Sequence, residues 1–351
     1  MASRLAGETS LATSGPLSPA ANRGWRARVR RAAVRVLAAL CFLTAALLLA
    51  GAVYQFGATK LDARAYAAPG RMVDVGGHRL HLYCTGEGAR TVILEAGLGG
   101  GVLDWGSVQP EVARFARVCS YDRAGAGWSE AGPAPRDSRQ VVGELHALLG
   151  NAGLRPPYVL VGHSLGGLHA QLFASRYPEE VAGVVLVDST HEGQAARKEY
   201  APPSAYYALL VKAAAPVGVG RLFLKFNPPS EHIPGALAAE WAAVYSHTGH
   251  LYSVADEALN IRESMRELRE SPMRLGGKPL VVLTRGARPP ASEGEEAEAA
   301  ERVWRELQAD LASRSTNARQ VIAEKSGHYI QFDEPGLVID AIRQVADGAV
   351  R

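Results

Sequence analysis

Cysteine is scarce in this 351-residue chain, and so is any excess of charge of one sign. Only three cysteines are present, which excludes a framework of several disulfides as the main source of stability. The formal net charge is +3, and beyond residue 35 the acidic and basic side chains roughly balance. A chain without a basic excess has no electrostatic support for nucleic-acid binding. We therefore expect no nucleic acid among its partners.

The sequence also lacks the patterns that hold metals or phosphates. No His, Cys and Asp residues have metal-site spacing, and no glycine-rich segment has the spacing of a phosphate-binding loop. No metal or cofactor is therefore predicted. What the chain does have is 47% apolar residues, enough for a sizeable core. Its length suits one large α/β domain with an insertion, or two small domains.

One long segment, Val36 to Phe56, carries no charge at all. At 1.5 Å per residue, a helix of this length spans a hydrocarbon core of about 30 Å. A group of arginines before it favours a cytoplasmic N-terminus, which places everything after Phe56 outside. These arginines are Arg23, Arg26, Arg28, Arg30, Arg31 and Arg35. We predict a disordered basic N-terminus over 1–32, a transmembrane anchor over 33–56 and a linker over 57–70.

A cleaved signal peptide is the alternative to a retained anchor. Ala50-Gly51-Ala52 has the small-x-small pattern of a cleavage site, although the apolar run is longer than in a usual signal. The alternative predicts a secreted protein, and the anchor predicts a membrane-bound one with an extracytoplasmic domain.

Strand-like and helix-like segments alternate after residue 70, which is typical of βαβ units. Continuous apolar runs such as Val181–Val187 and Leu280–Leu283 indicate strands buried on both faces. The alternation stops between His191 and Met273, where a helix-like stretch is broken by prolines. Such a span is far longer than a usual βα connection. We predict an α/β core over 71–190 and 274–351, with a helical cap over 191–273.

A nucleophile elbow is predicted at Ser164. Val159–Val161 reads as a buried strand, Gly162-His163-Ser164-Leu165-Gly166 has the G-x-S-x-G pattern, and a helix follows. The elbow needs small residues on both sides of its serine because strand and helix approach closely there. The pentapeptide alone is weak, but its strand–helix context points to a nucleophile.

A serine hydroxyl needs a base, and His328 is the best placed histidine. It follows the last predicted strand, on a loop before the terminal helix. Serine first and histidine last is the chain order that the α/β-hydrolase arrangement requires.

From about Arg71 to its end, the chain resembles the α/β-hydrolase superfamily, in the branch of lid-bearing esterases. The matching motifs are Gly97-Leu98-Gly99-Gly100, Tyr121-Asp122-Arg123-Ala124-Gly125-Ala126-Gly127-Trp128-Ser129, the elbow, and Ser326-Gly327-His328. The resemblance implies a mostly parallel eight-stranded sheet in the order 1-2-4-3-5-6-7-8, with helices on both faces. It also implies an oxyanion hole made by the backbone N–H groups of Leu98 and Leu165. Ala96 departs from the family, in which many members have histidine.

The acid of the triad has two candidates. Most relatives place an aspartate after the strand Leu280–Leu283, but here the nearest acid in that region is Glu293. Asp188 follows the preceding strand, a position that some relatives use. We favour Asp188, because a carboxylate that orients a histidine must lie on a rigid element.

The family's strand order also places Cys84 and Cys119 on neighbouring strands, within reach of a disulfide. Cys41 lies in the apolar run and is interpreted as a small hydrophobic residue.

The resemblance and the motifs predict a serine hydrolase that cleaves an ester-type bond, a carboxylic ester, thioester or amide, through an acyl-enzyme. The substrate is expected to be a small ester-like molecule. A serine at the elbow argues against epoxide hydrolases and dehalogenases, which use aspartate there. The alternative is a non-hydrolytic acyltransferase or a catalytically silent binding protein of the same fold.

Overall fold

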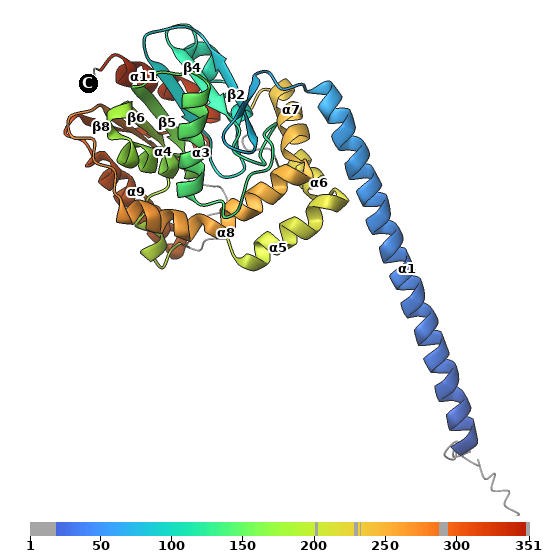
Figure 1. The fold of residues 1–351 in the computed structure, drawn as a ribbon. Coiled ribbons are helices and arrows are strands. Elements are labelled where there is room, and N and C mark those ends of the chain that lie inside the picture. The colour runs from blue at the N-terminus through green and yellow to red at the C-terminus, as the bar shows by residue number, and fades with distance from the viewer. Residues whose placement is uncertain (1–18, 201–202, 228–230, 232, 288–293, 349–351) are drawn as a thin grey trace, which may run out of the picture. The chain divides into compact units, whose positions relative to one another are not determined.

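The computed structural model describes residues 19–200, 203–227, 231, 233–287 and 294–348. The chain divides into two compact units, Met1–Ala50 and Gly51–Arg351. The first contains most of the long helix α1 (Pro19–Ala65), and the second contains the end of that helix and the α/β core. Figure 1 shows the elements in chain order.

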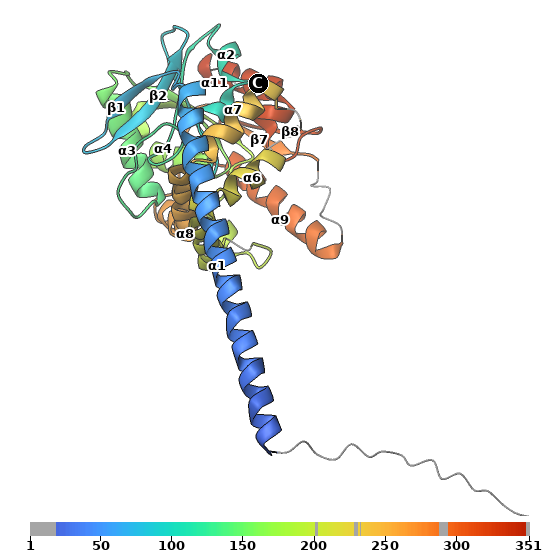
Figure 2. The same cartoon turned by 90° about the vertical axis from the view of Figure 1, so that its right-hand side faces the viewer.

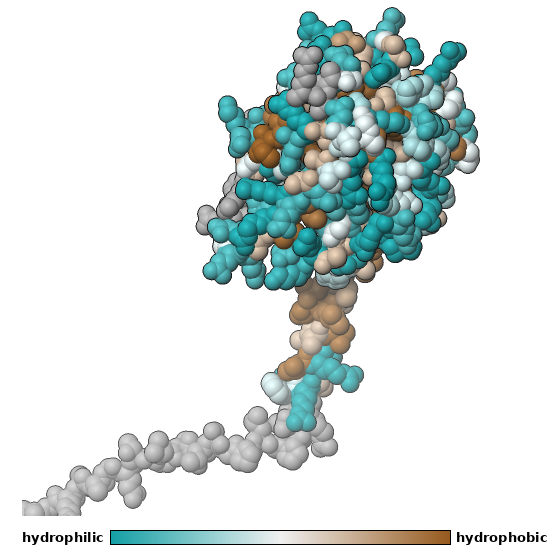
Figure 3. All heavy atoms as spheres, turned by 90° about the vertical axis from the view of Figure 1, so that its left-hand side faces the viewer, coloured by the Kyte–Doolittle hydropathy of each residue, from teal (hydrophilic) through white to brown (hydrophobic). Residues whose placement is uncertain are grey.

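Helix α1 is longer than the sequence predicts at both ends. Residues 19–32 are helical rather than disordered, and residues 57–65 of the expected linker continue the same helix. Ala, Leu and Arg favour helix, and a helix already formed is extended at little cost. Its most apolar window has a mean hydropathy of 2.6 and is exposed throughout, so the helix is long and apolar enough to cross a membrane. Figure 3 shows hydrophobic residues along this helix.

Eight strands form one sheet in the order β1-β2-β4-β3-β5-β6-β7-β8, which confirms the predicted topology. β1 and β2 pair antiparallel, β2 and β4 pair antiparallel, and all other neighbours pair parallel. The apolar runs Val159–Val161, Val181–Val187 and Leu280–Leu283 fall in β5, β6 and β7. The eight strands are β1 (Arg71–Asp74), β2 (Arg79–Thr85), β3 (Thr91–Glu95), β4 (Arg117–Tyr121), β5 (Tyr158–His163), β6 (Val181–Val187), β7 (Leu280–Arg285) and β8 (Ala318–Ala323).

Helices cover both faces of the sheet, because successive strand residues point to opposite sides. In β3, Ile93 packs in one core cluster while Val92 and Leu94 pack in the other. The core helices and 3-10 turns are η1 (Val102–Trp105), α2 (Gln109–Val112), α3 (Ser138–Asn151), α4 (Leu165–Arg176), η2 (Pro178–Glu180), α9 (Glu295–Ala312), α10 (Ile330–Asp333) and α11 (Pro335–Ala346). The side chain of Asp137 caps α3 by accepting from the amide of Gln140.

The described residues of the inserted segment 191–273 are mostly helical, and we call this segment the cap. Its elements are η3 (Gln194–Ala196), α5 (Ala205–Ala214), η4 (Ala215–Val217), α6 (Val219–Phe226), α7 (Gly235–Tyr245) and α8 (Thr248–Glu270). Figure 2 shows α6, α7 and α8 from the side. Trp241 and Tyr245 of α7 pack in a cluster with Leu103 of the core. The indole N–H of Trp241 donates to Asp104 at 2.9 Å, so polar contacts also hold the cap.

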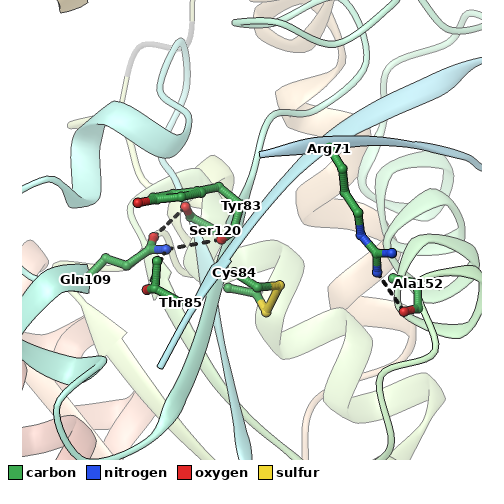
Figure 4. Close-up of a disulfide and its surroundings, with 8 residues drawn as sticks. Arg71, Tyr83, Cys84, Thr85, Gln109, Ser120 and Ala152 are labelled. Atoms are coloured by element: carbon green, nitrogen blue, oxygen red, sulfur yellow. Dashed lines mark hydrogen bonds between the residues drawn. A yellow bond between two sulfur atoms is a disulfide. The ribbon is translucent and has the colours of Figure 1, made fainter. Parts of the chain in front are cut away.

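Cys84 and Cys119 form a disulfide, which confirms the predicted pair. The two residues face each other in the antiparallel pairing of β2 with β4. Figure 4 shows the bond between these strands, close to the hydrogen bond from Ser120 to Gln109. The disulfide therefore ties the antiparallel end of the sheet to its parallel body.

Candidate active site

Ser164 lies at the turn between β5 and α4, where the sequence predicts a nucleophile. Its φ of 52° is unusual for a residue with a side chain. The amide of Ser164 donates to the carbonyl of Val187 at 3.1 Å, and its own carbonyl accepts from the amide of Thr190 at 2.9 Å. These two bonds fasten the turn to the end of β6. The neighbouring strand thus holds the serine in its strained conformation.

Two glycines allow this turn to form. A Cβ atom on Gly162 would lie 2.5 Å from the carbonyl oxygen of Gly166, and one on Gly166 would overlap the backbone of Glu95. Real Cβ atoms do not approach other atoms so closely, so neither position has room for a side chain. The spacing of the G-x-S-x-G pattern therefore has a direct steric cause here.

His328 and Asp188 are brought together from opposite ends of the second half of the chain. The Nδ1 atom of His328, on the loop between β8 and α10, lies 2.6 Å from Oδ2 of Asp188. Asp188 follows β6, is fully buried, and has a φ of 41°. The alternative acid, Glu293, lies outside the described residues. Between the two candidates, the described contacts favour Asp188.

Asp188 has further hydrogen-bond donors besides His328. The indole N–H of Trp304 donates to Oδ1 at 2.9 Å, and the backbone amide of Arg285 donates to the same oxygen at 3.1 Å. The Arg285 guanidinium donates to Oδ2 at 3.0 Å. Burial alone would raise the pKa of Asp188, but the bond to His328 and the charges of His328 and Arg285 hold that pKa below its usual range. Asp188 is therefore ionised at neutral pH, and Nδ1 of His328 is the donor.

Sequence reasoning missed Arg285 and Trp304. Arg285 also forms an ion pair with Glu301 at 3.0 Å, and its guanidinium lies over the Trp304 ring at 4.4 Å from the ring centre. The one available signal was position: Arg285 ends β7, at the strand end where most relatives carry their acid. Trp304 belongs to the helical pattern of α9, which gives no hint of a contact with Asp188.

His163 is the variable residue of the G-x-S-x-G pattern, and its side chain bonds the loop that carries His328. Its Nε2 atom lies 2.9 Å from the backbone carbonyl of His328, so it donates to that carbonyl. Burial, and to a smaller extent repulsion from His328, lowers the pKa of His163 to about 3. A neutral ring that donates from Nε2 fixes the loop that carries His328.

The segment Gly97-Leu98-Gly99-Gly100, which we call the predicted oxyanion loop, packs directly on the elbow. A Cβ atom on Gly97 would lie 2.9 Å from Nδ1 of His163 and 3.2 Å from Cβ of Ser164. Leu98 follows this glycine, and Leu165 begins α4. The close approach brings the backbone of the loop to Ser164.

Arg123 braces the same loop from behind. Its guanidinium donates to the carbonyls of Ala96 and Gly97, each at 2.7 Å. The group is buried, and it forms ion pairs with Glu95 of β3 at 2.8 Å and with Glu257 of the cap at 2.7 Å. Burial would lower the pKa of Arg123, but Glu257 and Glu95 outweigh it and raise that pKa well above the usual range. Arg123 therefore stays charged, which agrees with a bracing role.

A cavity of about 400 Å³ opens over these groups. Ser164, His328, Leu98 and Leu165 all line it, together with Arg285 and Trp304. The structure thus gathers the predicted nucleophile, the predicted base and both predicted oxyanion residues around one space, with room for a small molecule.

Comparisons with known proteins agree with this architecture. A family model described as the alpha/beta hydrolase fold matches residues 90–217. The uncharacterized protein YqjL of Bacillus subtilis (strain 168) is 29% identical over 260 residues, which is 74% of this chain and 85% of that protein. These matches support the resemblance of the chain to the α/β-hydrolase superfamily.

Two solved structures show the same fold. The epoxide hydrolase CorEH superposes with a TM-score of 0.60 at 18% identity, over 79% of this chain and 98% of that one. The enol-lactonase from Burkholderia xenovorans LB400 superposes with a TM-score of 0.59 at 19% identity, over 79% of this chain and 100% of that one. Both are hydrolases by name, so the shared fold carries more than one hydrolytic chemistry.

Proposed function

We propose that this protein is a serine hydrolase that cleaves an ester-type bond through an acyl-enzyme. The observation that carries the proposal is the 2.6 Å contact between Asp188 and His328, at a cavity that Ser164 also lines. A serine at the elbow supports this chemistry over that of the epoxide hydrolases, which share the fold.

Each residue has a distinct task in the proposed reaction. The hydroxyl of Ser164 attacks the substrate carbonyl while Nε2 of His328 accepts its proton. The N–H groups of Leu98 and Leu165 donate to the oxyanion, a contribution typically of a few kcal/mol to lowering the barrier. Asp188 holds the ring by accepting from Nδ1 and stabilises the imidazolium. His328 then protonates the leaving group, and water, deprotonated by the same ring, releases the acid.

Labelling by a fluorophosphonate, which reacts with activated serines, tests the proposal. We expect the wild type to be labelled and to hydrolyse short soluble esters such as 4-nitrophenyl acetate. Ser164→Ala should lose both properties while its thermal unfolding stays nearly unchanged, because one partly exposed hydroxyl contributes little to packing. Ser313→Ala, an exposed serine at the end of α9, is the matched control and should behave as wild type. Labelling of a well-folded Ser164→Ala variant would contradict the assignment, and a wild type that is neither labelled nor active would favour a catalytically silent protein.

We also propose that α1 is retained as a membrane anchor with the catalytic unit outside. The support is its length, its hydropathy and the five exposed arginines at its described N-terminal end, Arg26, Arg28, Arg30, Arg31 and Arg35. Secretion after signal cleavage is the alternative.

A further inference from the structure

Two cap helices expose a concentrated set of apolar side chains. Helix α5 and helix α6 are joined by η4 and bend by 99° between Val217 and Val219. Among the described residues beyond α1, eleven large hydrophobic side chains are exposed, and eight of them belong to these two helices. The eight are Tyr206, Tyr207, Leu209, Leu210, Val219, Leu222, Phe223 and Phe226. By contrast, the face of the catalytic unit seen in Figure 3 is mostly hydrophilic. A concentration of this kind marks an interaction surface.

This surface adjoins the last turns of the apolar run of α1. Gly51 lies inside that run, and a Cβ atom on it would lie 2.5 Å from the carbonyl oxygen of Val217 in η4. One turn further, the side-chain amide of Gln55 donates to the carbonyl of Ser246 at 2.8 Å. The guanidinium of Arg221 in α6 donates to Gln55 at 3.1 Å and pairs with Asp62 at 2.5 Å. All these residues belong to the unit Gly51–Arg351. The bend between α5 and α6 therefore lies beside the residues with which the proposed anchor leaves the membrane.

A second cavity opens between the same helices and the catalytic site. Its volume is about 440 Å³, and Tyr207, Leu210, Val219 and Phe223 contribute to its lining. Leu98 lines both this cavity and the one over Ser164, so the two spaces adjoin at the predicted oxyanion loop. His250 is among the polar residues that line it, and burial, with repulsion from His247 and Arg123, lowers the pKa of His250 to about 3. The walls are thus apolar and uncharged, which suits a hydrocarbon chain.

We propose that α5 and α6 lie in the surface of the same membrane that holds α1, and that the second cavity receives the acyl chain of a membrane-borne ester. The substrate half of this proposal rests on the proposed serine-hydrolase function. Ten and eight residues, bent by 99°, are too short to span a bilayer, so the helices lie along its surface. Their inward sides are held on the protein through Ala208, Ala215 and Arg221, which are buried. Exposed tyrosines among the apolar residues are typical of a membrane interface.

The chemistry follows from the neighbouring cavities. An acyl chain in the second cavity places its ester carbonyl near Leu98 and hence over Ser164. Ser164 forms the new acyl bond as the alcohol leaves with a proton from His328. Water then breaks the acyl-enzyme and gives a long-chain carboxylic acid, so a single-chain ester and one water are consumed in each turnover.

Fluorescence tests the membrane contact without any hydrolysis. In a Cys41→Ala background, full-length protein in phosphatidylcholine vesicles is labelled with an environment-sensitive dye at Leu209→Cys on α5, or at Ile322→Cys on strand β8 as the control. Both positions are exposed in the described structure. We expect a blue-shifted emission and quenching by nitroxide lipids at position 209 and neither at 322. Equal, water-like signals at both positions would overturn the membrane contact, as would a dimer that shields position 209 from the quencher.

Hydrolysis tests the route of the substrate. The double variant Leu209→Glu/Phe226→Glu changes two exposed side chains that line neither cavity. We expect it to hydrolyse a long-chain monoacylglycerol in vesicles about tenfold more slowly, because two apolar groups no longer enter the lipid. Its turnover of 4-nitrophenyl acetate, and all activities of Ile322→Glu, should match wild type. Unchanged turnover of the vesicle substrate would overturn the proposed route. A wild type that hydrolyses neither ester, yet shows quenching at 209, would instead refute the proposed function and leave the membrane contact standing.

Discussion

The carboxylate of Asp188 accepts hydrogen bonds from three different parts of the chain: the His328 loop, the end of β7 and helix α9. These donors hold the Asp188 carboxylate in one orientation. They help to hold the residue at a φ of 41°, which an aspartate rarely adopts. The guanidinium of Arg285 and Nδ1 of His328 both contact Oδ2 of Asp188. Arg285 thus holds both carboxylate oxygens, Oδ1 through its backbone amide and Oδ2 through its guanidinium.

Replacing Asp188 tests its role in orienting the base. Asp188→Asn removes the charge and permits the wrong tautomer of His328, so we expect turnover of a soluble ester to fall by about 10⁴-fold if the site behaves as serine proteases do. Substrate affinity should change much less. Steady-state turnover numbers of Asp188→Asn and Glu293→Gln, measured side by side, decide between the two acids.

Asp310→Asn serves as the matched control, since its carboxylate also bonds a histidine, His191, at 2.9 Å but lies outside the site. It should keep nearly full activity. A crippled Glu293→Gln beside an active Asp188→Asn would reverse our assignment.

Single residues were predictable from sequence where a local pattern surrounds them. Ser164 lies between two sterically required glycines, and His328 follows a strand at the expected place in chain order. Arg285 and Trp304, which bond Asp188, and Glu257, which pairs with Arg123, were not predictable. Their contacts join elements far apart in sequence. Side-chain packing between β7, α9 and the cap creates those contacts. The spacing of residues within one element does not indicate such packing.

Among the elements, the strands were the most predictable and the ends of α1 the least. A strand buried on both faces is a continuous apolar run, as in β6, and such a run has few other interpretations. The end of α1 is stabilised by Gln55, Asp62 and Arg221, and the last of these is 159 residues further along the chain. Tertiary contacts of this kind extend a helix beyond what composition suggests.

The disulfide between β2 and β4 yields a stability prediction at this scale. It closes a loop of 35 residues, and the chain-entropy model then gives about 3–4 kcal/mol of stabilisation. Cys84→Ser/Cys119→Ser should therefore lower the unfolding midpoint of the purified protein by several degrees. Calorimetry of the double variant against Cys41→Ser, which removes the exposed free cysteine, measures the difference. An unchanged midpoint, or alkylation of Cys84 and Cys119 without reductant, would count against the bond.

At the scale of the whole molecule, the helical insertion and the long apolar helix were both predictable from sequence for simple reasons. A helix-like span of about 80 residues is too long for a βα connection, and an uncharged run of 21 residues is too long for most buried helices. The apolar face of α5 and α6 was not predictable, because composition does not say which side of a short helix faces the core.

Topology gives the last prediction. With the N-terminus in the cytoplasm, protease added outside intact cells should digest the catalytic unit, and fractionation should leave the protein with membranes. A cytosolic protein of known location, expressed in the same cells, controls for leakage. Full-length protein in the cytosolic fraction would contradict the anchor, and a shortened soluble form would favour signal cleavage.

Arg123 bonds the predicted oxyanion loop and also pairs with Glu257 of the cap. The positions of the loop and of the cap are therefore energetically coupled. Lifting the cap would leave a buried guanidinium without one carboxylate partner, which is costly in free energy. Coupling of this kind is reciprocal. A ligand that stabilises the cap on the core also stabilises the loop in its described position, and stabilising the loop favours the packed cap by the same free energy. In the proposed mechanism, enclosing the substrate and preparing the site for the oxyanion are therefore one equilibrium.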